Sequence, residues 1–551
     1  MSPNGGVPPR LSGIAIWKNS PKKSDFNEIK SKGEDNFIVK WTDGSWQKAF
    51  TETFTEFCDC TSIHGIKHFL NHSWFERLLW IVLFVISITG CSLMISLVWQ
   101  KWNQSPVILS FDNKLMTMAA IPFPAVTVCS DAKVDIDQFN YRSAYEKYLR
   151  NEKLNETEIE YLLAIDSNFC KNIKDPSNLP LPDKVIDKEF MRDLAIQSND
   201  FISCESGLNS IGGVEHSNCI LDIQRISTNE GLCYTFNLLN TNELLNEGVL
   251  NDYDNNKNNN MSGWHPYTGY ENYIRGVTYP KRSFGAGSTR GINLHLKTRP
   301  ANYVNQCSNE SHHGYNIFLH PPTDYPWKKE YMYKVGMDQQ MAIIIKPPSI
   351  ITSENLKGYP ILKRKCYFED ERKLKLFRYY SQANCELECL TSIMFKKCGC
   401  VEYWMPHLPH MTECKFNRII DHPNCSYDDI EIAIQEERVK TIVDIDNQLE
   451  CNCLPSCNSI QYEADQTMLL NRAEEDSGKN DSIKYVNILL YYKTFQFIPM
   501  KRTELYTDLD FISNCGGLLS LFIGTSLLSI VEVLYFFTIR LVDNIKAKKN
   551  L

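Results

Sequence analysis

Two long runs of apolar residues constrain this chain more than any other feature. Residues 78–99 contain no charged side chain, and residues 511–539 contain a single one, Glu532. About 20 apolar residues in a helix are enough to cross the ~30 Å of hydrocarbon in a bilayer. The sequence therefore predicts two transmembrane helices, one toward each end of the 551 residues.

The distribution of charge predicts how these helices are oriented. Lys and Arg residues gather in segments 1–77 and 540–551, which flank the two runs. Positively charged flanks usually stay in the cytosol. We therefore expect a two-pass protein of the plasma membrane with both termini in the cytosol and residues 100–510 outside the cell. The net charge of −8, with no dense basic patch, argues against a nucleic-acid partner.

Cysteines and glycosylation signals support an extracellular location for residues 100–510. Sixteen of the 20 cysteines lie there, and an even number suits disulfides in an oxidising compartment. We expect disulfides at Cys129, Cys170, Cys204, Cys219, Cys233, Cys307, Cys366, Cys385, Cys389, Cys398, Cys400, Cys414, Cys425, Cys451, Cys453 and Cys457, in pairs that the spacing does not decide. The free thiols should be Cys58, Cys60, Cys91 and Cys515. Acceptor motifs for N-glycans stand at Asn155, Asn260, Asn309, Asn424 and Asn480.

The expected extracellular domain mixes helices and strands. Residues 135–163 are charged and compatible with helix, and residues 379–397 have a helical pattern that puts Cys385 and Cys389 on one face. Runs rich in β-formers predict strands at 231–239, 291–298, 314–320, 341–346 and 487–500, the last leading straight into the second apolar run. The predicted fold class is an α+β membrane protein, with two transmembrane helices and a large disulfide-rich ectodomain.

The second apolar run carries small and polar residues at mid-membrane depth. One helical face would hold Ser513, Gly517, Ser520 and Gly524. Such a face either packs closely against another helix or lines water. The triplet Gly524-Thr525-Ser526 and the acid Glu532 favour a pore, because an ionisable group in lipid costs ~2.5 kcal/mol or more unless it faces a polar cavity. Two helices cannot enclose a pore, so a pore requires an oligomer.

Motifs of enzyme chemistry are missing from the sequence. It contains no HExxH, no G-x-S-x-G and no GxxxxGK[ST]. The clustered cysteines could be read as zinc ligands, but they are not spaced as C-x2-C and no histidine stands at partner spacing. We expect no enzymatic activity, no cofactor and no metal site.

Six motifs, in order along the chain, resemble the degenerin/epithelial sodium channel superfamily. They are His64-Gly65, FPAVTVCS at 123–130, GLCYTFN at 231–237, one cysteine-rich region made of segments 385–406 and 451–462, Gly524-Thr525-Ser526, and Glu532. The resemblance extends from about residue 64 to residue 540.

This resemblance implies a homotrimer or heterotrimer of hand-shaped subunits that conducts Na+ in preference to K+ and is blocked by amiloride. It implies that Gly524, Thr525 and Ser526 form the selectivity filter. His64, Gly65 and Glu532 would line the lower pore, with Gly65 in a re-entrant turn that suits a residue free to adopt positive φ. Ser513 would stand at the gate, next to Asn514 where acid-sensing members often carry Asp.

Within the superfamily, the chain is most similar to invertebrate FMRFamide-gated sodium channels. The stretch WQKWNQSPV at 99–107 lacks the histidine pair of acid-sensing members. An extracellular amidated peptide needs carboxylates for its cations and an apolar cleft for its rings. Candidates are Asp131, Asp135, Asp137, Phe139 and Tyr141, which could equally be the start of a solvated helix. The alternatives are an acid-sensing or constitutively open sodium channel, an ATP-gated trimeric channel, and a non-conducting two-pass receptor.

Overall fold

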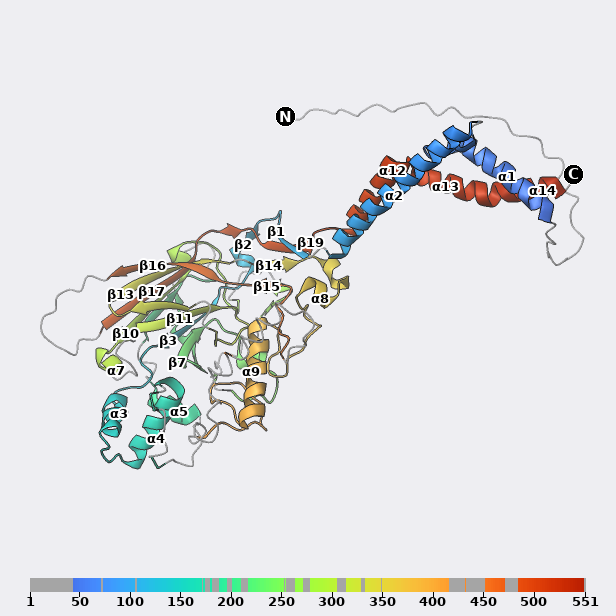
Figure 1. Cartoon of the computed structure of the whole chain (residues 1–551). Helices are drawn as coiled ribbons and strands as arrows, with labels where there is room; N and C mark the ends of the chain where they lie inside the picture. Colours follow the sequence, from blue (N-terminus) through green and yellow to red (C-terminus); the bar gives the residue numbers. More distant parts are fainter. Residues whose placement is uncertain are drawn as a thin grey trace, which may run out of the picture. The chain divides into compact units, whose positions relative to one another are not determined.

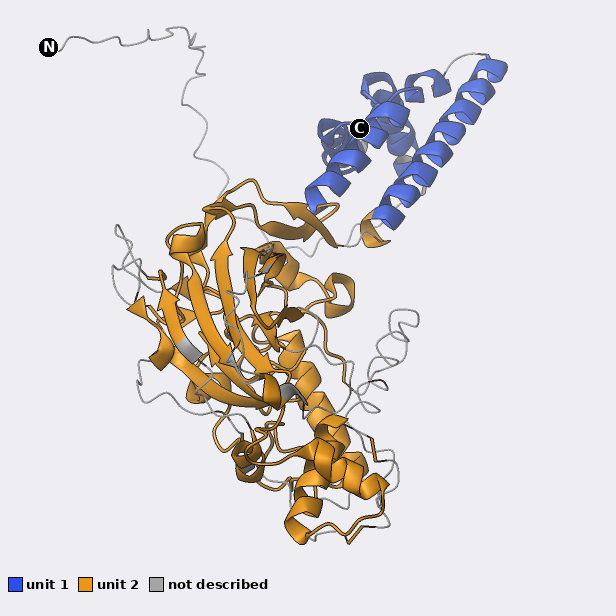
Figure 2. Cartoon of the chain, turned by 90° about the vertical axis from the view of Figure 1, so that its left-hand side faces the viewer, with its two compact units in different colours: residues 1–101, 508–551 blue, residues 102–507 orange. Residues whose placement is uncertain are grey.

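The chain divides into two compact units, shown in Figure 2. Residues 1–101 with 508–551 form the first, which we call the helical unit, and residues 102–507 form the second, which we call the large unit. The computed structural model describes residues 43–549 except for 71–72, 105–106, 171, 174–178, 181–187, 196–200, 210–216, 252, 254–262, 271–277, 305–313, 329–331, 348, 416–431, 433–450 and 471–483.

The helical unit contains both apolar runs. Its elements are α1 (Asp43–Cys60), η1 (Ile66–Leu70), α2 (Trp74–Gln104), α12 (Asp508–Ile523), α13 (Leu527–Tyr535), η9 (Phe536–Arg540) and α14 (Leu541–Lys549). Among the described residues, α2 is the one continuous helix with the length and apolar composition to cross a membrane. The second run is two helices, Asp508–Ile523 and Leu527–Ala547, which meet the same criterion together and are bent by 68° where they join.

Three larger sheets build the large unit (Figure 1). The six-stranded sheet has the order β16 (Glu463–Leu470), β13 (Gln339–Lys346), β17 (Lys484–Tyr492), β10 (Ile292–Thr298), β4 (Phe201–Ser206) and β5 (Ser217–Asn218). The five-stranded sheet has the order β12 (Met332–Gly336), β11 (Gly314–His320), β3 (Ala125–Ser130), β7 (Gly231–Phe236) and β6 (Ile223–Thr228). The four-stranded sheet has the order β1 (Val107–Phe111), β19 (Met500–Glu504), β14 (Ser349–Thr352) and β15 (Ser459–Ile460).

Two short strand pairs lie outside these sheets. β18 (Gln496–Phe497) pairs with β2 (Met116–Thr117), and β8 (Trp264–His265) pairs with β9 (Gly269–Tyr270). The pairings between strands are antiparallel except for β13 with β17 and β14 with β19. Strands predicted at 231–239, 291–298, 314–320 and 341–346 are confirmed as β7, β10, β11 and β13.

An apolar core lies between the six-stranded and five-stranded sheets. Alternate residues of β13, Met341, Ile343 and Ile345, are fully buried, as the two-residue period of a strand requires. They share one cluster with Val126 of β3 and Ile317 of β11. The sequence alternation of β13 therefore sets which face of its sheet meets the other sheet.

Helices share a core cluster with the five-stranded sheet. They are α3 (Tyr141–Leu149), α4 (Glu156–Ile165), α5 (Lys188–Leu194), α6 (Thr241–Leu244) and α9 (Gln382–Cys398). Two further short helices are α7 (Pro300–Val304) and α8 (Ile361–Arg364). The helices predicted in 135–163 and 379–397 are thus confirmed. α4 begins with a capping box, in which Asn155 accepts from the backbone N–H of Glu158 and the Glu158 carboxylate accepts from the N–H of Asn155.

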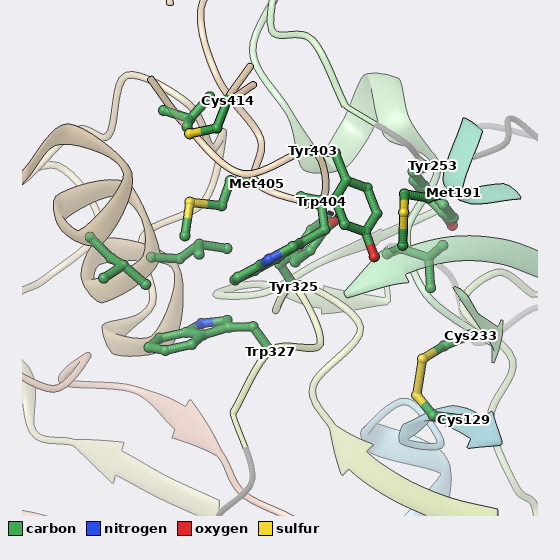
Figure 3. Packing of buried hydrophobic residues seen from close by; sticks show 14 of the residues in the cluster. Cys129, Met191, Cys233, Tyr253, Tyr325, Trp327, Tyr403, Trp404, Met405 and Cys414 are labelled. Carbon is green, nitrogen blue, oxygen red and sulfur yellow. Dashed lines mark hydrogen bonds between the residues drawn. A yellow bond between two sulfur atoms is a disulfide. The ribbon is translucent and has the colours of Figure 1, made fainter. Parts of the chain in front are cut away.

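Buried aromatic residues join α9 to the five-stranded sheet (Figure 3). Tyr325 donates its hydroxyl proton to the carbonyls of Ser227, at 2.8 Å, and Trp404, at 3.1 Å. Trp327 donates from Nε1 to the carbonyl of Ala383 at 3.0 Å. Each of these rings therefore brings its polar atom to a partner inside the core, as a buried Tyr or Trp must.

One strand prediction is wrong. Residues 487–500 do not form a single strand that leads into the second apolar run, because β17 ends at Tyr492 and the chain continues as the short β18 and then as β19. β17 pairs within the six-stranded sheet whereas β19 pairs with β1 and β14 of another sheet, so the chain has to leave one sheet for the other. Pro499, which has no N–H to donate, lies in this crossing.

Candidate pore segment and re-entrant turn

The second apolar run is interrupted at the triplet Gly524-Thr525-Ser526. α12 ends at Ile523, α13 begins at Leu527, and none of the three residues between them is helical. Gly524 has φ of +73°, in the left-handed region that costs an L-residue ~1–2 kcal/mol. The glycine therefore allows the chain to leave the helix at this point, although its own N–H still donates to the carbonyl of Ser520 at 2.9 Å.

Ser526 restarts the helix after the break. Its hydroxyl accepts from the backbone N–H of Ser529 at 3.2 Å, and the hydroxyl of Ser529 accepts from the N–H of Ser526 at 3.1 Å. This reciprocal cap satisfies two N–H groups that the first turn of any helix leaves without a partner. The same serine is thus predicted as a filter residue and found as a helix cap.

The His64-Gly65 turn lies against the break. The backbone N–H of His64 donates to the carbonyl of Ile523, the last residue of α12, at 2.9 Å. Gly65 has φ of +86°, so the positive φ expected for this glycine is confirmed. A methyl group built on Gly524 would overlap the imidazole ring of His64. Two motifs from opposite ends of the sequence therefore meet at one point.

Ser62 extends this contact to the acid in the second run. Its hydroxyl lies 2.7 Å from the Ser529 hydroxyl and donates to the Glu532 carboxylate at 3.3 Å. Ser529 is almost fully buried, with 1 % of its surface exposed. Neither Ser62 nor Ser529 is among the site residues predicted from the sequence, although the S-x-x-S spacing from Ser526 to Ser529 is itself a helix-start pattern.

The stripe of small residues does not pack against α2 in this chain. A methyl group on Gly90 of α2 would lie 3.1 Å from the ring of Phe522, so this is where the two helices approach closely. A methyl group on Gly517 would meet no atom within 4 Å, and Ser513 and Ser520 are exposed. Asn514, beside the predicted gate, donates from Nδ2 to the carbonyl of Asp510 at 2.8 Å.

Helices α1 and α14 pair beyond the second run. The guanidinium of Arg540 donates to both oxygens of the Glu56 carboxylate, at 2.9 and 3.0 Å. This hydrogen bonding lowers the pKa of Glu56 below its usual value. Asn544 adds a bond from Nδ2 to the Thr53 hydroxyl at 2.9 Å. The segment before the first run is thereby joined to the segment after the second.

The five predicted peptide-binding residues are not brought together in one cleft. Phe139 and Tyr141 are core side chains, 8 % and 2 % exposed, and Tyr141 donates to the buried Asp166 carboxylate at 2.7 Å. Asp137 is exposed and forms an ion pair with Arg299 at 2.8 Å.

The other two acids of this group have local partners. Asp131 accepts from Nδ2 of Asn316 at 2.7 Å, and burial raises the pKa of Asp131. Asp135 accepts from the backbone N–H of Asp137 at 3.2 Å, which stabilises the turn before α3. Their use by a peptide stays a prediction.

The expected disulfides are largely formed. The described pairs are Cys129–Cys233, Cys204–Cys219, Cys366–Cys457, Cys385–Cys453, Cys389–Cys451 and Cys400–Cys414. Cys170 and Cys398 are also disulfide-bonded. Cys58, Cys60, Cys91 and Cys515 are free, as expected. The predicted cysteines Cys307 and Cys425 and the glycan acceptors Asn260, Asn309, Asn424 and Asn480 lie outside the described residues, whereas Asn155 is described and exposed.

Comparison with known proteins agrees with the motifs. The family model described as "Amiloride-sensitive sodium channel" matches residues 57–536. Pickpocket protein 28 of Drosophila melanogaster is 25 % identical over 502 residues, which cover 87 % of this chain and 77 % of that protein. Sodium channel protein Nach of the same fly is 23 % identical over 514 residues, covering 90 % of this chain and 88 % of that protein.

More distant matches add little. The epithelial sodium channel subunit gamma of Rattus norvegicus is 23 % identical over 251 residues, 41 % of this chain and 35 % of that protein. A proton-activated chloride channel solved by cryo-EM aligns with a TM-score of 0.25 and 6 % identity, covering 84 % of this chain and 96 % of that one, which is too low to bear on the fold. The family match spans most of the sequence. The chain therefore belongs to the amiloride-sensitive sodium channel family, whose members are ion channels of the plasma membrane and not enzymes.

Proposed function

We propose that this chain is the subunit of an amiloride-blocked, Na+-selective homotrimeric channel. α2 and the bent pair α12–α13 would be its two membrane spans, with both termini in the cytosol. The observation that carries the proposal is the contact between the His64-Gly65 turn and the helix break at Gly524. The resemblance names both motifs as pore elements, and the structure joins them by a hydrogen bond.

The break supplies what an ion filter needs. Irregular backbone at membrane depth is tolerated only where it is buried in protein or lines water, and carbonyls outside a helix can turn toward a cation. The hydroxyl of Thr525 is buried and has no hydrogen-bond partner among the residues that the structure describes. In a trimer, three such triplets would surround one axis, where this hydroxyl could find a partner in a neighbouring subunit or on the ion.

The remaining predicted pore residues fit around this filter. His64, Gly65 and Glu532 would line the pore on its cytosolic side, with Ser62 and Ser529 holding the acid in position. The Ser513 and Gly517 stripe would face the axis toward the outside, since Ser513 is exposed and a methyl group on Gly517 would meet no described atom within 4 Å. Ser513 and Asn514 would then form the gate.

Voltage-clamp recording with ion substitution tests this proposal. The expressed chain should give an amiloride-sensitive current whose reversal potential follows Na+. Ser526→Val should lower the Na+/K+ permeability ratio, because it removes a filter hydroxyl and the cap of α13. Thr538→Val is the matched control, since the Thr538 hydroxyl bonds only within its own helix, to the carbonyl of Leu534 at 2.5 Å. A reversal potential that follows K+ or Cl− contradicts the proposal.

We further propose that an extracellular FMRFamide-like peptide opens the channel. A peptide bound with ~1 μM affinity needs ~8 kcal/mol of binding free energy, and an exposed ion pair supplies at most ~1 kcal/mol. The site must therefore bury an aromatic ring of the peptide as well as pair its cations. Asp137 is the most accessible candidate acid, and Phe139 lies beneath the same turn.

The stimulus is tested by applying pH steps, ATP and amidated peptides to the same cells. We expect the peptides to open the channel, and Asp137→Ala to shift their dose–response to higher concentration without changing Na+ selectivity. Arg299→Gln, which removes the partner of Asp137, should leave that acid free and shift the dose–response the other way. Opening by acid alone would favour the acid-sensing alternative. Current without any stimulus would favour a constitutively open channel, and no current at all would favour a non-conducting receptor.

A further inference from the structure

The large unit contains a cavity of about 520 Å³ that the proposed pore does not use. It lies between the β8–β9 pair, the loop after β11 and the start of α9. Aromatic rings form much of its lining: Trp264, Tyr267, Tyr270, Trp327, Tyr379 and Tyr380. Its size and its apolar lining are those of a site for a small organic molecule.

Arg282 brings an unpaired charge to this cavity. The residue lines the cavity and is 1 % exposed. Its Nη1 donates to the carbonyl of Ala119 at 3.0 Å, but Nε and Nη2 are buried and find no hydrogen-bond partner in the described part of the chain. The guanidinium lies 4.3 Å from the ring centre of Tyr270 and 4.9 Å from that of Phe284, so its faces meet aromatic groups and not an acid.

The acid of the cavity does not neutralise Arg282. Asp324 accepts hydrogen bonds from Thr323 and Ser381, and the charge near it is that of Lys328. Among the described residues, no carboxylate forms an ion pair with Arg282. A buried charge that is left unpaired costs several kcal/mol, and buried donors without partners are rare in native proteins. The arrangement therefore calls for an anionic group that the chain itself does not provide.

The geometry of the free donors indicates which anion. Nε and Nη2 lie on the same edge of the planar guanidinium, so their N–H bonds point in parallel. Two parallel N–H donors match the two oxygens of a carboxylate, which is the strong bidentate form of the arginine–carboxylate pair. A halide or other spherical ion would use this edge less well and would leave the aromatic part of the cavity empty.

We propose that this cavity binds a small organic carboxylate with an aromatic body, its two oxygens on the Nε/Nη2 edge of Arg282 and its ring against the Tyr270 side of the lining. Such a ligand is an anion, whereas the peptide proposed as agonist carries cations and an amidated C-terminus without a carboxylate. The site is thus a second one, separate from the peptide and from the pore. Its occupant would stabilise the packing of the β8–β9 pair and the loop after β11 against the start of α9.

The test uses the full chain purified in detergent and does not depend on conduction. The probes are 3-(4-bromophenyl)propionate and its neutral isostere 3-(4-bromophenyl)propionamide, whose bromine quenches nearby tryptophan. Trp264 and Trp327 line the cavity, so binding should quench part of the intrinsic fluorescence saturably. We expect the carboxylate to bind at least about tenfold more tightly than the amide, because only the carboxylate pairs with Arg282.

Variants locate the binding. Arg282→Gln should weaken binding of the carboxylate at least about tenfold and leave binding of the amide nearly unchanged. Arg150→Gln removes an exposed arginine outside the cavity and should bind both probes like the wild type. The proposal is overturned if neither probe quenches saturably at millimolar concentration, if carboxylate and amide bind alike, or if a folded Arg282→Gln binds the carboxylate like the wild type. Should Arg282→Gln not fold, the two probes on the wild type still decide.

Discussion

Replacing Gly524 with alanine tests the contact between the re-entrant turn and the helix break. At φ of +73°, alanine costs ~1–2 kcal/mol relative to its favoured conformations. Its methyl group would also overlap the imidazole of His64, so the turn would have to move and its 2.9 Å bond to the carbonyl of Ile523 would be lost, at ~0.5–1.5 kcal/mol. The sum is ~1.5–3.5 kcal/mol against the native arrangement, or roughly a 12- to 300-fold shift in its population.

The assay is the Na+/K+ permeability ratio from reversal potentials, together with the amount of channel at the cell surface. We expect Gly524→Ala to reach the surface and to lose current or selectivity there. Gly516→Ala is the matched control, because a methyl group at Gly516 meets no atom within 4 Å and the residue lies inside helix α12. Alanine should favour that helix by ~1 kcal/mol and leave conduction as in the wild type.

A double variant separates the two parts of the effect. In His64→Ala/Gly524→Ala the overlap is gone but the backbone strain remains, so the loss should be smaller than the sum of the two single losses. Strictly additive losses would show that the two residues do not touch. The reasoning as a whole is refuted if Gly524→Ala at normal surface level keeps both the wild-type current and the wild-type permeability ratio.

Three further predictions concern the large unit. Burial raises the pKa of Asp324 to about 6 and lowers that of His320 to about 4, so between pH 4 and 6 Asp324 makes the fold less stable as pH rises and His320 makes it more stable. Thermal unfolding of Asp324→Asn should therefore show stability that rises more steeply with pH than in the wild type, and His320→Gln should show stability that falls with pH. Each variant should differ from the wild type by roughly 3 kcal/mol in its change of stability between pH 4 and 6. Parallel slopes in the wild type and both variants would contradict this. Cys389→Ser and Cys451→Ser should each lower stability by ~2–5 kcal/mol, and the double variant by no more than either, as measured by denaturant unfolding. Tyr141→Phe should lower stability by ~1.5–3 kcal/mol, because a buried carboxylate loses its 2.7 Å donor; an unchanged midpoint would exclude that bond.

Much of the fold could be predicted because its signals are local. The alternation of residues along β13 and the helical spacing of Cys385 and Cys389 are visible in short windows of sequence, and both are confirmed. The pairing of those two cysteines with Cys453 and Cys451 could not be read in the same way. Pairing depends on which segments the fold brings together, and spacing along the chain carries no information about that.

In the candidate pore, too, only the features with a local signal could be predicted. A glycine between two apolar helical stretches predicts a helix break, and the structure has a break at Gly524. Ser62 carries no such signal, because it becomes significant only when the turn after it meets the helix that begins at Leu527.

Acidic and aromatic residues close together in sequence, as in the predicted peptide site, can indicate either a ligand-binding cleft or a hydrogen-bonded core. In a short window, Phe139 and Tyr141 beside aspartates look like a cleft for a ring and a cation. In the structure Tyr141 points to Asp166, a carboxylate 25 positions along the chain that the window does not include. The hydroxyl of Tyr141 therefore has its hydrogen-bond partner inside the core and is not offered to a ligand. A surface that binds an aromatic ring must be sought where aromatic residues line a cavity, as they do around Arg282, and not where they only neighbour acids in the sequence.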